Sequence, residues 1–155
     1  MTPAIGSRAP DFSARNQYGE HVRLADFRGR RDVVLVFYPY AFSGVCTSEL
    51  TALRDRPDLL AAAEFLAISC DPMFTLRAYA DAQKLGFGLL TDFWPHGAIA
   101  SSYGVFDSDR GCAVRGTFVV DRTGVIRWSV VNAIPEARDP DDYAAALTKL
   151  GIDLG

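Results

Sequence analysis

Two nearly continuous apolar runs constrain the fold of this chain most. Val33–Tyr38 reads VVLVFY and Glu64–Cys70 reads EFLAISC. Such runs, rich in β-branched and aromatic residues, are typical of strands that are buried on both faces of a sheet. A helix-like stretch, TSELTALRDRPDLL, lies between them. A strand, a helix and a second strand in this order predict a crossover that joins two parallel strands.

The flanking segments predict further strands on the same sheet. DFSARN and HVRLADF flank the polar turn QYGE, which indicates a short N-terminal β-hairpin. FGLLTD is a short strand, and AVRGTFVVDRTGVIRWSVV predicts two strands joined at DRTG. Together with the crossover, these segments predict an α/β chain with a mixed central sheet flanked by helices, compatible with a thioredoxin-like fold.

Three other segments predict helices. One covers 71–86, with Asp71 at the N-cap, Pro72 at the first helical position and Gly86 at the end. HGAIASSYG predicts a small helix or turn. The last helix has Asp139 at the N-cap and ends at Gly151.

Length and charge exclude several classes of function. A chain of 155 residues fits one domain, 1–155, with a substantial core. The net charge of −3, without a basic cluster, argues against nucleic acid or an anionic membrane as a partner. We find neither a signal peptide nor an apolar run of membrane-spanning length, and therefore expect a cytoplasmic protein.

The cysteines indicate neither a disulfide scaffold nor a metal site. There are three of them, Cys46, Cys70 and Cys112, and no C-x-x-C. The two histidines are far apart in sequence, so we expect no metal and no cofactor.

Cys46 lies at the junction between the first predicted buried strand and the helix that follows it. If Ser43 is the N-cap, Cys46 is the third helical residue, near free backbone N–H groups and the positive end of the helix dipole. Both features favour the thiolate. Cys46 also shares a helical stripe with Leu50 and Leu53, so position alone equally allows a buried structural cysteine.

Four segments together resemble the peroxiredoxin family. PYAFSGVC fits the family's active-site signature, Pro-x-x-x-Thr/Ser-x-x-Cys, and GSRAPDF, FRGRRDVVLVFYP and VRGTFVVDRTG resemble the family's other conserved segments in the same order. LLTDFWPHGAIASSYGVF further resembles the alkyl-hydroperoxide-reductase-E-like, one-cysteine branch. The resemblance implies a thioredoxin-like fold of peroxiredoxin type and a thiol-dependent peroxidase that acts on hydrogen peroxide, organic hydroperoxides and peroxynitrite.

The resemblance also implies roles for named residues. Cys46 is the nucleophile that becomes a sulfenic acid, and Arg115 holds its thiolate and donates to the peroxide. Ser43 orients the peroxide, although it could also only cap the helix. Pro39 shields Cys46. For Glu49, an ion pair with a site arginine and an exposed helix position are equally compatible with the sequence.

The sequence does not determine which thiol reduces the sulfenic acid of Cys46. The position five residues after Cys46, where one two-cysteine branch has its partner, is Thr51, and no cysteine follows Cys112. Cys70, and less so Cys112, could resolve the sulfenic acid internally. We expect an external thiol instead: by resemblance, mycothiol with a glutaredoxin-like protein, or thioredoxin.

Other classes of function remain open on the sequence. A disulfide oxidoreductase is disfavoured by the missing C-x-x-C, and a binding or chaperone module with a structural Cys46 by the intact motif residues. A redox relay to a partner protein is compatible with peroxidase chemistry. The resemblance implies a homodimer with loops near Tyr40 and Trp94 at the interface, whereas the residues alone slightly favour core positions for Tyr40, Phe93 and Trp94.

Overall fold

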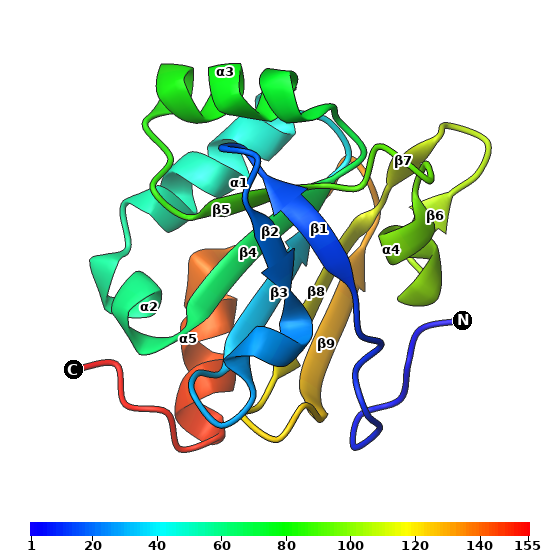
Figure 1. Cartoon of the computed structure of the whole chain (residues 1–155). Coiled ribbons are helices and arrows are strands. Elements are labelled where there is room, and N and C mark those ends of the chain that lie inside the picture. Colours follow the sequence, from blue (N-terminus) through cyan, green and yellow to red (C-terminus); the bar gives the residue numbers. More distant parts are fainter.

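A seven-stranded mixed sheet organises the molecule, which we describe from a computed structural model covering residues 1–155 (Figure 1). Its strands are β1 (Ser13–Asn16), β2 (His21–Arg23), β3 (Val33–Phe37), β4 (Glu64–Ser69), β5 (Gly88–Thr91), β8 (Arg115–Val120) and β9 (Ile126–Asn132). They lie in the order β2-β1-β5-β4-β3-β8-β9. β3, β4 and β5 are parallel, and the other pairs are antiparallel.

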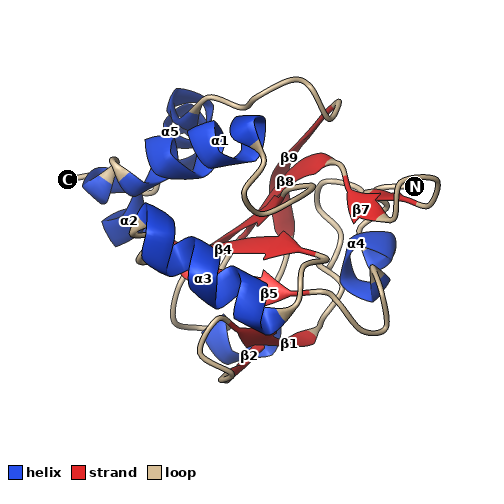
Figure 2. Cartoon of the chain, turned by 90° about the horizontal axis from the view of Figure 1, so that it is seen from above, coloured by secondary structure: helices blue, strands red, loops and turns tan.

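Helices cover both faces of this sheet (Figure 2). The helices are η1 (Leu24–Phe27), α1 (Gly44–Arg54), α2 (Pro57–Ala62), α3 (Met73–Gln83), α4 (Ala98–Ser102) and α5 (Pro140–Lys149). α1, α2, α3 and α5 pack on one face, whereas η1 and α4 pack on the other. A separate two-stranded ribbon consists of β6 (Phe106–Asp107) and β7 (Cys112–Ala113). None of the helices combines the length and hydrophobicity that crossing a bilayer requires.

Strand alternation divides the core into two clusters. In β3, Val34 and Val36 face α1 and α3, whereas Leu35 and Phe37 face α4. Every residue of β3 is buried, as expected for a central strand covered on both faces. The prediction of a mixed α/β sheet with a parallel crossover from 33–38 to 64–70 is therefore confirmed.

Some helix boundaries differ from the predicted ones because of proline residues and local hydrogen bonds. The helix-like stretch after Cys46 is two helices, because Pro57 lacks an N–H and begins a new helix, α2. The predicted N-cap of α3 was wrong: Pro72 occupies that position, and the Asp71 carboxylate bonds elsewhere. α3 ends at Gln83 rather than at Gly86, and its C-cap residue, Lys84, adopts left-handed backbone at φ 54.

Other local predictions are confirmed. The N-terminal hairpin pairs Ser13 with Arg23, and its second arm is short because η1 follows directly. Asp139 caps α5 by accepting a hydrogen bond from the backbone N–H of Asp141. Gly151, at φ 82, ends that helix in the left-handed conformation that glycine adopts without steric cost.

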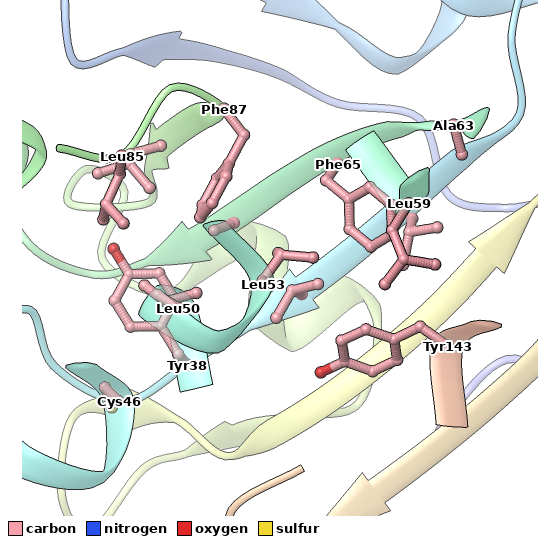
Figure 3. Packing of buried hydrophobic residues seen from close by; sticks show 14 of the residues in the cluster. Tyr38, Cys46, Leu50, Leu53, Leu59, Ala63, Phe65, Leu85, Phe87 and Tyr143 are labelled. Atoms are coloured by element: carbon pink, nitrogen blue, oxygen red, sulfur yellow. The ribbon is translucent and has the colours of Figure 1, made fainter. Parts of the chain in front are cut away.

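The cluster under α2 provides a test of how much the core packing stabilises the protein. Leu59 is completely buried, together with Phe65 and Tyr143 (Figure 3). We expect Leu59→Ala to lower the free energy of unfolding by about 2–5 kcal/mol, because it removes apolar contacts and leaves a cavity. Urea denaturation followed by circular dichroism measures this change.

Leu150, which is 37% exposed at the end of α5, supplies the matched control. We expect Leu150→Ala to change the free energy of unfolding by no more than about 0.5 kcal/mol. Equal losses in the two variants would contradict the assignment of Leu59 to the core.

Candidate active site

The antiparallel register of β8 brings Arg115 to the start of α1. Val36 of β3 pairs with Thr117, so Arg115 lies two residues further, opposite the carboxyl end of β3. Arg115, Thr117 and Val119 alternate onto the same face, which is the face that α1 covers. Two residues 69 positions apart in sequence, Cys46 and Arg115, are thus brought into contact.

Cys46 is completely buried at the first turn of α1. Ser43 is the N-cap residue and Cys46 is the third helical residue, as the sequence predicted. Leu50 and Leu53 share its stripe and point into the core (Figure 3). Arg115 Nη1 donates a hydrogen bond to Cys46 Sγ at 3.3 Å. A guanidinium at this distance stabilises negative charge on a sulfur atom. A cysteine that only fills the core has no need of such a partner.

Glu49, one turn after Cys46, is buried between two arginines. Its Oε1 accepts hydrogen bonds from Arg115 Nη1 and from Arg138 Nη2, the latter at 2.9 Å, and its Oε2 accepts from Arg138 Nε at 2.7 Å. Glu49 as a whole is only 4% exposed. Glu49 is therefore an ion-pair residue at the site, and the alternative of a solvent-exposed helix glutamate was wrong.

Arg138 is the site residue that sequence reasoning missed. Besides Glu49, its guanidinium donates to the Gly116 carbonyl at 3.0 Å and to Thr117 Oγ1 at 3.1 Å. Burial alone would lower the pKa of Arg138, but the hydrogen bonds to Glu49 outweigh it and raise the pKa above its usual range. Arg138 lies in the loop between β9 and α5, where no periodic pattern marks a buried position.

Pro39 and Ser43 lie on the segment that leads from β3 into α1. Pro39 is buried directly after the strand, and Ser43 is half-buried. Contrary to the expectation of side-chain capping, the Ser43 hydroxyl makes no hydrogen bond to the helix N-terminus. The hydroxyl therefore remains available to a bound substrate.

The other two thiols are also buried and unpaired in disulfides. Burial is the main cause that raises the pKa of Cys70 to about 12, and the negative charge of Asp92 adds to it. Cys70 is thus a weak nucleophile at neutral pH. Cys112 lies in β7, outside the main sheet. That Cys70 or Cys112 reduces the sulfenic acid of Cys46 stays a prediction, and the positions of these two cysteines do not support it.

The three aromatic residues for which the sequence slightly favoured core positions over an interface are exposed in the single chain. Tyr40 is 42%, Phe93 is 47% and Trp94 is 82% exposed. They lie in loops after β3 and β5, at the carboxyl edge of the parallel strands. Loops that follow a strand edge run over the surface, which is why an aromatic residue there need not be buried.

These features define a class of protein. No group of three or more His, Cys, Asp or Glu side chains gathers in an arrangement suited to a metal ion. What the site offers is a buried thiol at a helix start with a guanidinium in contact, on a thioredoxin-like sheet. This combination is typical of a thiol-based redox enzyme.

Comparisons with known proteins agree with this class. The family model described as AhpC/TSA matches residues 5–129. The chain is 45% identical over 151 residues to alkyl hydroperoxide reductase E of Mycobacterium tuberculosis, covering 94% of this chain and 97% of that protein. It is 34% identical to the chloroplastic 2-Cys peroxiredoxin BAS1 of Hordeum vulgare, covering 96% and 75%.

Solved structures agree in fold. The crystal structure of AhpC from Enterococcus faecalis superimposes with a TM-score of 0.85 at 28% identity, covering 97% of this chain and 93% of that one. Peroxidoxin BcpB of Mycobacterium tuberculosis gives a TM-score of 0.82 at 28% identity, covering 96% and 97%. The chain belongs to the AhpC/TSA family and is a peroxiredoxin of the alkyl-hydroperoxide-reductase-E-like type. It is a thiol-dependent peroxidase, and a binding or chaperone module is not favoured.

The buried ion pairs around Glu49 generate a stability prediction. We expect Arg138→Met to lower the free energy of unfolding by about 3–5 kcal/mol, because Glu49 loses one of its two buried cations. Chemical denaturation measures the change.

The control is Arg127→Met, because Arg127 pairs with Asp121 at 2.8 Å while its side chain is 54% exposed. A solvent-screened pair contributes at most about 1 kcal/mol. A smaller loss for Arg138→Met than for this control would contradict the role of Arg138 in the network.

Proposed function

We propose that Cys46 is the nucleophile of the peroxidase and that Arg115 is its cationic partner. The observation that carries this proposal is the 3.3 Å contact between Arg115 Nη1 and Cys46 Sγ. The charges around the contact support it. Arg115 and Arg138 share the single carboxylate of Glu49, so the buried cluster has one excess positive charge. A thiolate on Cys46 neutralises that charge.

The reaction is an in-line displacement at oxygen. The thiolate of Cys46 attacks the terminal oxygen of R–O–O–H, the S–O bond forms as the O–O bond breaks, and R–O⁻ leaves and takes up a proton. Arg115 and the backbone N–H groups of Val45 and Cys46 stabilise the departing charge. The Ser43 hydroxyl orients the peroxide, and Pro39 keeps bulk water from the sulfur. Hydrogen peroxide, organic hydroperoxides and peroxynitrite are the proposed substrates.

The sulfenic acid on Cys46 is returned to thiol by an external reductant. A first thiol forms a mixed disulfide with Cys46 and releases water, and a second thiol then displaces Cys46 as the free thiol. The high pKa of Cys70 supports this one-cysteine route, because a protonated thiol attacks slowly. Mycothiol with a glutaredoxin-like protein, or thioredoxin, is the proposed donor, and the cytoplasm is the proposed location.

A homodimer is the proposed assembly. Exposed aromatic side chains gather around the carboxyl edge of the sheet, namely Tyr40, Phe42, Phe74, Phe93 and Trp94. Three of them, Phe74, Phe93 and Trp94, line a cavity of about 530 Å³ between the start of α3 and the loop after β5. Aromatic residues are enriched at protein interfaces, and clustered exposed apolar surface marks an interaction site.

Rapid kinetics test the assignment of the nucleophile. We expect Cys46→Ser to abolish the fast change in tryptophan fluorescence after mixing with one equivalent of a hydroperoxide. Arg115→Met should slow it by about 10²–10³-fold, because it removes a donor to the developing charge. Cys70→Ser and Cys112→Ser are the matched controls and should keep the wild-type rate.

Mass spectrometry of the oxidised protein tests the route of reduction. One added oxygen, about 16 Da, on Cys46 is the expected product. A disulfide between Cys46 and either of the other cysteines would show that resolution is internal, and full activity in Cys46→Ser would overturn the assignment altogether.

The assembly has a separate test. We expect Trp94→Asp to convert the dimer to a monomer in sedimentation velocity experiments, because it places a charge in an apolar interface. Leu150→Asp, at the end of α5, should leave the dimer intact. A wild-type monomer at micromolar concentration would contradict the proposed homodimer.

A further inference from the structure

We propose that Asp71 is a positioning residue for the segment Pro39–Ser43, which carries two of the proposed site residues into α1. This inference rests on the proposed function of Cys46 and extends it to a residue outside the site. Asp71 lies two residues after the end of β4 and does not cap α3. Its carboxylate is directed toward the segment after the neighbouring strand β3 instead.

Hydrogen bonds from three adjacent strand ends converge on Asp71. Its Oδ2 accepts from the backbone N–H of Ala41 at 2.8 Å and from Ser69 Oγ at 2.7 Å. Its main-chain carbonyl accepts from Thr91 Oγ1 at 2.6 Å. Because β3, β4 and β5 are neighbouring parallel strands, these bonds tie the segment after β3 to the ends of β4 and β5.

The tied segment has an unfavourable backbone conformation that requires such support. Phe42 adopts φ 68, in the left-handed region that residues with a Cβ rarely occupy. The residue as a whole is 54% exposed, so burial of the ring does not offset the cost of this conformation. The turn bond from the Ser43 N–H to the Tyr40 carbonyl is long, at 3.4 Å. A hydrogen bond to an ionised carboxylate is stronger than one between neutral groups, so the Asp71–Ala41 bond is the firmest polar restraint on this turn.

The position of this turn controls the chemistry at the sulfur. Ser43 immediately precedes the first turn of α1, and Pro39 is buried after β3. A shift of the turn therefore changes the distance of the Ser43 hydroxyl from a bound peroxide and also the access to Cys46. Small displacements of catalytic groups cause large losses in rate. Looser packing of the same segment makes the buried sulfur easier to reach.

Two rate constants with opposite responses test the inference. We expect Asp71→Ala to slow the oxidation of Cys46 by hydrogen peroxide about tenfold. The same variant should be alkylated faster at Cys46 by iodoacetamide, which requires access but no oriented peroxide. Asp71→Asn keeps an acceptor for the Ala41 N–H and should recover most of both wild-type rates. Asp81→Ala, on the exposed face of α3, is the matched control and should change neither.

Global unfolding would also expose Cys46, which is completely buried, to iodoacetamide and would abolish the peroxide reaction. Circular dichroism therefore first establishes that each variant is fully folded, and both rates are measured well below its melting temperature. Should Asp71→Ala not fold, Ser69→Ala removes one support of the carboxylate and should give smaller changes in the same two directions. Unchanged rates, or parallel decreases, overturn the inference. If wild-type Cys46 is not oxidised at all, the proposed function fails instead, whatever Asp71 does.

Discussion

The carboxylate of Glu49 is the point on which the geometry of the site depends. It holds the guanidinium groups of Arg115 and Arg138 together in a region from which water is almost excluded. A buried ion pair contributes little net stability, because desolvation of the charges offsets their attraction. Its effect here is directional: Arg115, further fixed by a 2.6 Å bond from Nε to the Ile134 carbonyl, presents Nη1 to the sulfur of Cys46.

The same arrangement links the site to most of the fold. Glu49 and Cys46 come from α1, Arg115 from β8, and Arg138 from the loop before α5. The two arginines stay close because Arg138 also bonds to Gly116 and Thr117, the residues that follow Arg115 in β8. Three segments separated in sequence are therefore joined at one buried charge cluster, and a packing defect in any of them changes the position of the others.

Sequence patterns correctly predicted the strands, turns and caps that depend only on residues close to one another in the chain. The apolar runs at 33–38 and 64–70, the hairpin turns and the Asp139 cap depend on neighbouring residues, and all are observed. Arg138 could not be found this way, because its burial results from two long-range partners that meet only after folding. The cap assigned to Asp71 was wrong for the same reason: a backbone N–H on another strand end competes for its carboxylate. Trp94 is exposed although its residue type suggests a core position.

The proposed choice of Cys46 over Cys70 as the nucleophile has an electrostatic basis in the structure. All three are buried, so exposure cannot distinguish them. Their surroundings differ: Cys46 has the guanidinium of Arg115 in contact, whereas burial first, and then the carboxylate of Asp92, raises the pKa of Cys70. The environment of Cys70 favours the protonated thiol, whereas the Arg115 guanidinium places a cationic hydrogen-bond donor on the sulfur of Cys46. Because only a thiolate attacks a peroxide, this difference supports Cys46 rather than Cys70 as the proposed nucleophile.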